Sequence, residues 1–291
     1  MKQSMKKLLT MLLTLAMMLA LAACGNSTET GQPAAPEASQ AVESNQPENT
    51  EASQPQAESD LAYVKAKGKL VIGYTVYEPM NYTDANGNFT GFDTELAILV
   101  CEKLGVEPEF VEIDWNTKEV ELNSKAIDCI WNGMTIDEER KQNMEITQPY
   151  VKNAQVVLVK KGTSYEGTAS LIGKTVVAEQ GSAGEDTILN DENLKQADYV
   201  PKSLQTECLL ELKAGTADAA VLDLTLAKTM TGEGTDYADI EIVDFLAVED
   251  YGVGFRKGSD ICAEVNKIFD ALLADGTMGK LAEKYGLELA D

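Results

Sequence analysis

The sequence predicts an α/β protein in which largely parallel sheets are flanked by helices, and three observations predict this class. Short apolar runs of strand length recur along residues 61–291. Between them lie segments of helix length in which apolar residues return every three or four positions. Strands that alternate with helices are typical of parallel sheets, because each parallel connection needs a crossover segment. Hydrophobic residues make up 44% of the 291-residue chain, which is enough to bury a sizeable core.

The first part of this region follows the pattern closely. Asparagine followed by glycine between two apolar runs indicates a hairpin, and a short polar residue before an apolar periodic segment indicates a helix cap. The predicted elements are a strand at 69–74, a hairpin at 82–89 that turns at Asn86-Gly87, a helix from the cap Asp93 to Gly105, a strand at 109–113, a helix at 117–124, a strand at 126–131 and a helix capped by Asp137.

The second part repeats the alternation. A small-residue turn at 180–184 separates a strand from a helix. We predict strands at 155–160, 174–179, 219–223 and 253–255, and helices near 185–189 and at 204–214, 259–275 and 277–285. Ligands of parallel sheets bind at the carboxyl ends of the strands, so candidate positions are Tyr74, 131–135, 179–183 and Asp223.

The N-terminal residues are predicted to be a targeting segment. Three lysines precede an apolar run of signal-peptide length at 8–23. The run ends in Leu21-Ala22-Ala23-Cys24-Gly25, which resembles the lipobox of bacterial lipoproteins, where the signal is cut before the cysteine and the cysteine receives lipid. We therefore expect a lipoprotein signal peptide at 1–23 and lipidation of Cys24. The alternatives are an uncleaved anchor and plain secretion with an unmodified Cys24.

Residues 24–60 differ in composition from the rest. They contain four of the chain's eight prolines, seven acids and no base, and they contain no aromatic residue. Such a segment buries too little apolar surface to offset the entropy of ordering it. We predict a disordered tether, so that the folded body works extracytoplasmically and meets the membrane only through the lipid anchor.

Charge and composition exclude several functions. The 48 acids outnumber the 24 bases, and a net charge of −24 argues against nucleic-acid binding. The chain has no histidine, which removes the Ser-His and Cys-His nucleophile pairs. The spacing of Asp84, Asn86, Asn88 and Glu95 matches a calcium loop, but its glycine position holds Phe89, so no metal site is predicted.

Four cysteines lie beyond Cys24, each in an apolar stretch and without a CxxC pair. We expect buried free thiols that pack as small hydrophobes. One disulfide remains an alternative outside the cell. The four are Cys101, Cys129, Cys208 and Cys262.

Five segments, in order, resemble motifs of the polar amino-acid-binding proteins of bacterial ABC importers (solute-binding protein family 3). Each motif alone is weak, and their shared order along most of 61–291 makes the resemblance specific. The segments are GFDTELA at 91–97, DCIWNGMTIDEER at 128–140, QPY at 148–150, AGTADAAVLD at 214–223 and YGVGFRKGS at 251–259.

This resemblance implies a two-lobed periplasmic-binding-protein fold (type II). Each lobe is a mainly parallel sheet flanked by helices, and two crossing strands form the hinge. Lobe 1 is expected from 61–151 with 251–291, and lobe 2 from 152–250. The resemblance further implies a monomer without a cofactor, which closes on a free polar amino acid and delivers it to a cognate ABC permease.

The resemblance also assigns groups to the two ends of a zwitterion. Arg140 matches the arginine whose planar fork holds the ligand carboxylate. Thr135 matches the residue that gives a backbone N–H to the carboxylate and a hydroxyl to the ammonium, and Gly133 matches the residue whose carbonyl accepts from the ammonium. Asp223 matches the carboxylate that pairs with the ammonium. The alternatives are a surface Arg140 and a helix-capping Asp223.

The remaining assignments concern the second lobe and the side-chain pocket. Backbone amides at a helix N-terminus favour an anion, which suits the ligand carboxylate. Three aromatic residues and one asparagine match positions in the walls of the side-chain pocket. Ordinary core packing is the alternative for the three aromatic residues. Trp131 is expected in the core. A carboxylate among the pocket positions predicts a polar or cationic ligand side chain. In order, these positions are Ser182 and Ala183 for the amides, Tyr77, Trp115, Tyr74 and Asn132 for the walls, and Glu179 for the carboxylate.

The leading hypothesis is therefore a non-enzymatic receptor. Two other classes stay open on the same fold. The first is a dehydratase-like enzyme, in which Glu179 and Asp223 form an acid/base pair. The second is a ligand-sensing module that serves a signalling partner.

Overall fold

The structure is a computed structural model that describes residues 59–291. The predicted signal peptide, Cys24 and the tether up to residue 58 lie outside the described residues. The predicted tether extends two residues too far, because Ser59 and Asp60 begin the folded body. Ser59 Oγ caps helix α1 (Asp60–Lys67) by accepting from Ala62 N at 3.0 Å, and Asp60 pairs with Arg256 at 2.9 Å. Among the described helices, none has both the length and the apolar character of a membrane span.

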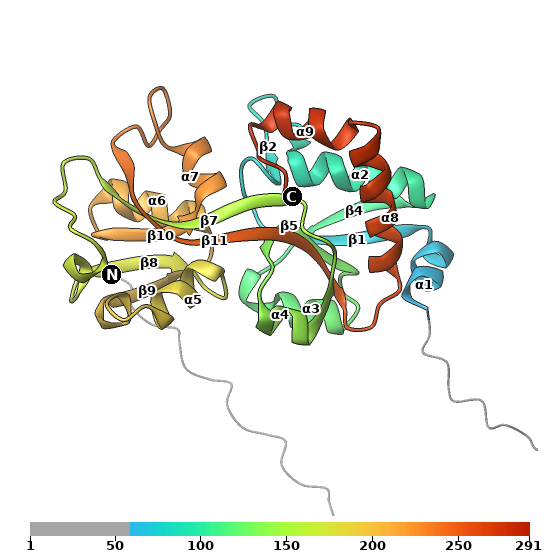
Figure 1. Ribbon diagram of the computed structural model, residues 1–291, viewed down its shortest axis with the longest axis horizontal. Helices are drawn as coiled ribbons and strands as arrows, with labels where there is room; N and C mark the ends of the chain where they lie inside the picture. Colours follow the sequence, from blue (N-terminus) through green and yellow to red (C-terminus); the bar gives the residue numbers. More distant parts are fainter. Residues whose placement is uncertain (1–58) are drawn as a thin grey trace, which may run out of the picture. The chain divides into compact units, whose positions relative to one another are not determined.

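Within residues 59–291, nine strands form one mixed sheet (Figure 1). The strands follow the order β4-β1-β5-β11-β7-β10-β8-β9, and β6 pairs with β11. Their bounds are β1 Lys69–Tyr74, β4 Glu107–Glu112, β5 Cys129–Thr135, β6 Met144–Ile146, β7 Val151–Lys160, β8 Thr175–Glu179, β9 Asp198–Lys202, β10 Ala219–Asp223 and β11 Ile240–Arg256.

Two long strands, β7 and β11, run through both halves of the sheet. β11 pairs with β7 from Ile240 to Tyr251, and its last residues pair with β5, where Tyr251 faces Thr135. On one side β1 is parallel to β4 and β5, and on the other β8 is parallel to β9 and β10. The predicted α/β class and the two crossing strands are confirmed. The two mainly parallel groups of strands are not separate sheets, because β7 and β11 join them into one mixed sheet.

Helices cover both faces of each half (Figure 1). In the first half, α1, α2, α8 and α9 lie on one face, and α3 and α4 on the other. In the second half, α6 and α7 lie opposite α5. Their bounds are α2 Phe92–Leu104, α3 Lys118–Asn123, α4 Glu138–Asn143, α5 Ala183–Asn190, α6 Gln205–Ala214, α7 Leu224–Met230, α8 Ile261–Ala274 and α9 Thr277–Tyr285.

Short elements complete the chain. The predicted hairpin is present, with β2 (Tyr82–Thr83) antiparallel to β3 (Phe89–Thr90). Single 3₁₀ turns connect larger elements at η1 Trp115–Thr117, η2 Thr168–Leu171 and η3 Leu194–Gln196. Strand β9 was not predicted from the sequence, because its side chains are largely exposed and form no apolar run.

The helix signals were correct except at Asp93. Gly105 adopts the left-handed conformation that ends α2, and Asp137 Oδ1 caps α4 by accepting from Arg140 N at 2.7 Å. Asp93 does not cap α2, which begins one residue earlier. Its fully buried carboxylate accepts instead from Gly133 N at 2.6 Å.

The largest apolar cluster extends through both halves of the sheet. Trp131 lies in it with no exposed surface and packs against Phe269, with ring centroids 5.8 Å apart. The expectation that Trp131 belongs to the core is confirmed. The four cysteines of the described region are buried and unpaired, as predicted for small hydrophobes: Cys101, Cys129, Cys208 and Cys262.

Candidate functional site

The carboxyl ends of β5, β8 and β10 meet beside the crossing strands, and they bring together polar side chains from distant parts of the chain. Arg140 follows β5, Glu179 ends β8 and Asp223 ends β10. All three side chains are at least nine-tenths buried, although each is charged at its ordinary pKa. Buried charges are costly unless they are paired, so this concentration indicates a binding site.

Arg140 is positioned by its own helix and by the second half of the sheet. Its Nε lies 3.1 Å from Asp137 Oδ2, its Nη1 donates to Thr135 O at 2.9 Å, and its Nη2 donates to Gly181 O at 3.4 Å. A guanidinium has five N–H groups, so one N–H remains on each terminal nitrogen. These two groups can hold both oxygens of a carboxylate. With 5% of its surface exposed, Arg140 is not the surface residue of the alternative interpretation.

Gly133 lies where two tyrosine rings leave no room for a side chain. Its φ is +58°, and a Cβ atom would lie 2.9 Å from the Tyr77 ring and 3.0 Å from the Tyr251 ring. Only glycine fits this position without strain. Thr135, the last residue of β5, donates its hydroxyl to Glu249 Oε1 at 2.9 Å.

Asp223 occupies the N-cap position of α7, but its side chain makes no capping bond. Oδ1 accepts from Asn153 Nδ2 at 2.6 Å and from Gln155 Nε2 at 2.7 Å, and Oδ2 accepts from Gln205 Nε2. Burial raises the pKa of Asp223, and the amide donors counteract this rise only in part. The carboxylate is thus buried, and its hydrogen-bond donors are neutral amides.

Glu249 is a second carboxylate at this point, which the sequence reasoning missed. It comes from β11 and accepts through Oε1 from Asn153 Nδ2 at 2.6 Å and from Gln155 Nε2 at 2.9 Å. Burial, and then the charge of Asp223, raise the pKa of Glu249 to about 8. Glu249 lies two residues before Tyr251, the first residue of one of the five family-like motifs. This proximity was the one sequence signal that could have indicated Glu249.

Glu179 and Lys118 form the other end of the site. Within the described residues Glu179 Oε1 has no hydrogen-bond donor, and burial raises the pKa of Glu179 well above its usual value. Lys118 Nζ donates to Gly181 O at 2.8 Å and lies 5.0 Å from the Trp115 ring centroid. Burial, followed by the charge of Arg140, lowers the pKa of Lys118 to about 8. Lys118 was not predicted, because a lysine in a short charged helix looks solvated.

The predicted amides lie at the start of α5. Ser182 caps this helix, and its own N–H donates to Glu179 O at 3.2 Å. Its backbone amide is therefore not available to a ligand. Ala183 is the first helical residue, where backbone N–H groups lack an intrahelical acceptor.

Two predicted wall residues make contacts within the first half. Asn132 exchanges hydrogen bonds with the Thr75 backbone and donates to Asn81 Oδ1 at 2.8 Å, so its amide is fully used inside the first half. Tyr74 packs on Phe89, with ring centroids 4.8 Å apart, and lines a different hollow. We therefore correct the sequence assignment of Asn132 to the ligand. The assignment of Tyr74 stays a prediction, because the hollow that it lines also contains Thr206 and Met230 of the second half.

The other two aromatic residues lie at the site. Trp115 is 5% exposed beside Lys118. Tyr77 is buried, and its hydroxyl bonds to Thr225 and, at 2.6 Å, to the hydroxyl of Tyr251. Tyr77 thus joins elements of both halves behind the carboxylate pair.

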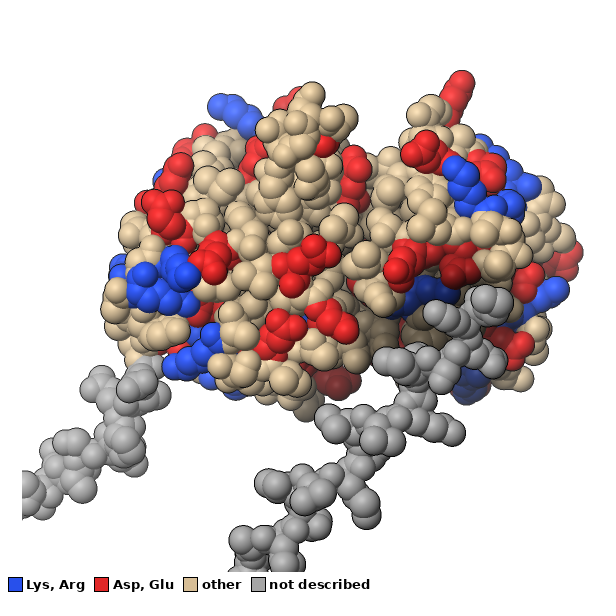
Figure 2. All heavy atoms as spheres, turned by 180° about the vertical axis from the view of Figure 1, so that it is seen from behind, with Lys and Arg blue, Asp and Glu red and all other residues tan. Residues whose placement is uncertain are grey.

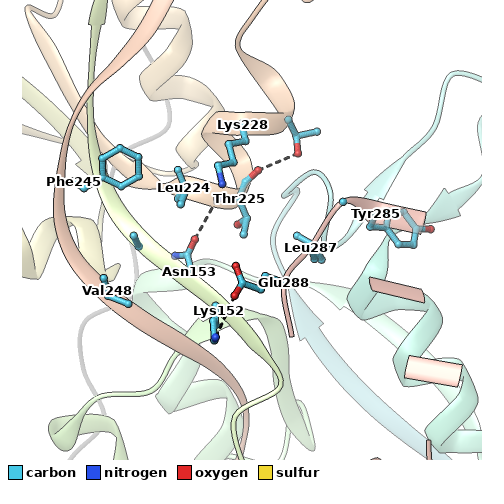
Figure 3. Close-up of a pocket in the computed structure, with 13 residues that line it drawn as sticks. Lys152, Asn153, Leu224, Thr225, Lys228, Phe245, Val248, Tyr285, Leu287 and Glu288 are labelled. Atoms are coloured by element: carbon cyan, nitrogen blue, oxygen red, sulfur yellow. Dashed lines mark hydrogen bonds and ion pairs between the residues drawn. The ribbon is translucent and has the colours of Figure 1, made fainter. Parts of the chain in front are cut away.

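A separate hollow of about 480 Å³ is lined by residues of β7, α7, β11 and the segment 285–288 (Figure 3). Asn153 separates it from the site, since Asn153 Oδ1 accepts from Thr225 N at 3.2 Å while Nδ2 reaches Asp223. None of the sequence-predicted ligand residues lines this hollow.

On the face in Figure 2, acidic and basic side chains are interspersed over the surface. In residues 59–291 no cluster of three or more acids or thiols is arranged to hold a metal ion.

Comparison with known proteins identifies the family. The model of the bacterial extracellular solute-binding proteins, family 3, matches residues 70–288. The chain belongs to this family. The resemblance predicted from the five motifs, the type II periplasmic-binding fold and the solute-binding class are therefore confirmed.

Individual members of the family are similar over most of their length. The arginine-binding extracellular protein ArtP of Bacillus subtilis is 29% identical over 75% of this chain and 86% of its own. The L-cystine-binding protein TcyJ of Escherichia coli is 31% identical over 77% of this chain and 85% of its own. The structure of an ancestral amino acid-binding protein, AncCDT-1, a precursor of cyclohexadienyl dehydratase, is 31% identical, with a TM-score of 0.71, over 78% of this chain and 98% of its own.

Proposed function

We propose that this family 3 protein binds a free amino acid with a basic side chain and delivers it to an ABC permease. One observation carries the proposal. The site contains three carboxylates, of which Glu179 and Asp223 are buried and Glu249 is partly buried, against the two buried cations Lys118 and Arg140. Asp137, which pairs with Arg140, adds a further acid, so the acids outnumber the cations and a ligand with net positive charge suits this set. Arginine and lysine carry one net positive charge at neutral pH.

Each end of such a ligand has a matching group. The two remaining N–H groups of Arg140 and the first amide of α5, at Ala183, suit the ligand carboxylate. Asp223, with Glu249 beside it, suits the α-ammonium. Glu179 suits the cationic side chain, because its buried Oε1 has no donor in the described region.

Removing the charge of Glu179 tests the choice of side chain. We expect Glu179→Gln to weaken arginine binding by about 10- to 100-fold, the loss of one charged hydrogen bond, and to affect glutamine much less. Calorimetry of the full chain with arginine, lysine, glutamine, cystine and glutamate provides the measurement. Glu166→Gln, an exposed acid of the second half, is the charge-matched control. Tightest binding of glutamate or of glutamine would contradict the proposal.

We also propose how the body closes. Residues 61–151 with 251–291 form one lobe, 152–250 form the other, and β7 with β11 act as the hinge. Contacts between these lobes support their closure on each other, since both Lys118 and Arg140 donate to Gly181 O. Closure around the ligand by a hinge then removes it from water.

The remaining proposals concern the cellular setting. We propose a monomer that is held to the membrane by lipid on Cys24 and presents its ligand to a cognate permease. We further propose that the ligand is not chemically transformed. Arg140 and Asp223 bind its carboxylate and its α-ammonium, which are groups that do not react. Recovery of arginine unchanged after prolonged incubation with the protein is the expected result.

A further inference from the structure

We propose that Glu249 is a second anchor for the ligand ammonium, and that Glu249 and Asp223 share one proton which the entering ammonium displaces. Capture of the amino acid is then coupled to release of a proton. The inference rests on the proposed function, because it requires a ligand that carries an ammonium group. In the exchange the proton leaves the carboxyl pair for a buffer base, and no bond of the ligand forms or breaks.

The geometry of the pair carries the inference. The same two amides donate to both acids, because Asn153 Nδ2 and Gln155 Nε2 each reach Asp223 Oδ1 and Glu249 Oε1 within 2.9 Å. Two carboxyl oxygens that share their donors lie beside each other. Two adjacent carboxylates in a shielded site do not both ionise readily, so one proton between them is the stable arrangement.

Two of the three amides that donate to the pair are fixed in orientation by bonds at their oxygen ends, whereas Gln155 Oε1 has no hydrogen-bond partner in the described region. Asn153 Oδ1 is held by Thr225 N at 3.2 Å (Figure 3), and Gln205 Oε1 by Asp223 N at 3.0 Å. Their donor ends must therefore face the acids. These donors are neutral, so the pair lacks a cationic partner among the groups that contact it in the described chain. A ligand ammonium supplies that partner.

The charged groups near the pair reinforce this conclusion. From the first half, Arg140 is engaged by Asp137, and Lys118 by a carbonyl on the far side of the site. The other titratable groups that face the pair are acids or phenols, none of which adds positive charge: Glu179, Asp137, Glu139, Asp186, Tyr77 and Tyr251.

The titration of the pair gives the direction of the effect. Burial raises the pKa of both acids, and that of Glu249 reaches about 8. One proton is then bound near neutral pH before the ligand arrives. Proton and ammonium compete for the same oxygens, so affinity falls as the pH is lowered.

Calorimetry of the full chain with arginine tests the coupling. Titrations at about pH 7 in phosphate and in Tris, two buffers with different ionisation enthalpies, report the protons exchanged. We expect the wild-type protein to release about one proton per arginine and Glu249→Gln to release close to none. Glu139→Gln removes an exposed acid from the hollow that Glu249 also lines, and it serves as the control. This variant should release as many protons as the wild-type protein.

A second measurement needs no variant. Between about pH 5.5 and about pH 7.5 the charge of arginine is constant, and its affinity for the wild-type protein should rise by up to tenfold per pH unit. Arginine binding without proton release, or with equal release from Glu249→Gln, overturns the inference and leaves the proposed function intact. Failure of arginine to bind at any pH overturns the proposed function instead.

Discussion

At the scale of single residues, Arg140 acts through its shape as well as its charge. Three of its N–H groups are used by Asp137, Thr135 and Gly181, which fixes the plane in which the other two point. A lysine at this position keeps the charge but has no planar fork.

We therefore expect Arg140→Lys to weaken amino-acid binding by about 10- to 100-fold, which corresponds to about 1.5–3 kcal/mol for a charged hydrogen bond. Calorimetry with arginine measures the loss. Lys141→Ala is the control, because Lys141 is exposed and pairs only with Glu138 of its own helix in the described region. Unchanged affinity of Arg140→Lys would mean that the ligand carboxylate binds elsewhere.

The same scale shows what the sequence could and could not predict. Arg140 and Asp223 were predicted through their motifs. Asp223 ends β10, where ligands of such sheets bind, and Arg140 lies in α4, the helix that follows β5. Glu249 and Lys118 were missed, since neither is marked by an apolar pattern around it. Asn132 was assigned to the ligand because nothing in a sequence reveals that a neighbouring backbone, at Thr75, already uses its amide.

At the scale of elements, β11 is the least predictable part of the fold. Only 253–255 could be predicted, although the strand runs for 17 residues. Its middle part carries exposed residues such as Val248, which is 88% exposed, and acids, so no apolar run marks it. Pairing with β7 holds this stretch extended, and such a partner is not visible in local sequence.

Helix α4 permits a test at this scale, because it carries Arg140 and depends on one cap. Asp137→Ala removes that cap and should lower the free energy of unfolding by about 1 kcal/mol. Asp137→Asn keeps an acceptor for Arg140 N and should stay near the wild-type value. Urea unfolding measures both variants, with the exposed Glu138→Ala as the control. Equal losses in Asp137→Ala and Asp137→Asn would assign the effect to charge and not to capping.

At the scale of the whole molecule, acids in the interior set how stability depends on pH. Burial raises the pKa of Asp93 to about 7 and that of Glu249 to about 8. The folded state then holds more protons than the unfolded state between about pH 4 and pH 8, so stability decreases as the pH rises through this range. Acids outside the core with lowered pKa, such as Asp84 and Asp275, act oppositely, but only below about pH 4.

We therefore expect maximal stability at mildly acidic pH, with the midpoint of thermal unfolding of the ligand-free protein falling as the pH is raised from about 5.5 to about 8. Asp93→Asn should flatten this dependence, because an amide at this position can still accept from Gly133 N but does not ionise. Asp84→Asn, in an exposed turn, is the control and should leave the slope unchanged. A midpoint that rises with pH over this range would show that the interior acids are ionised in the folded state. The neighbours of Asp93 would then stabilise its negative charge more than burial opposes it.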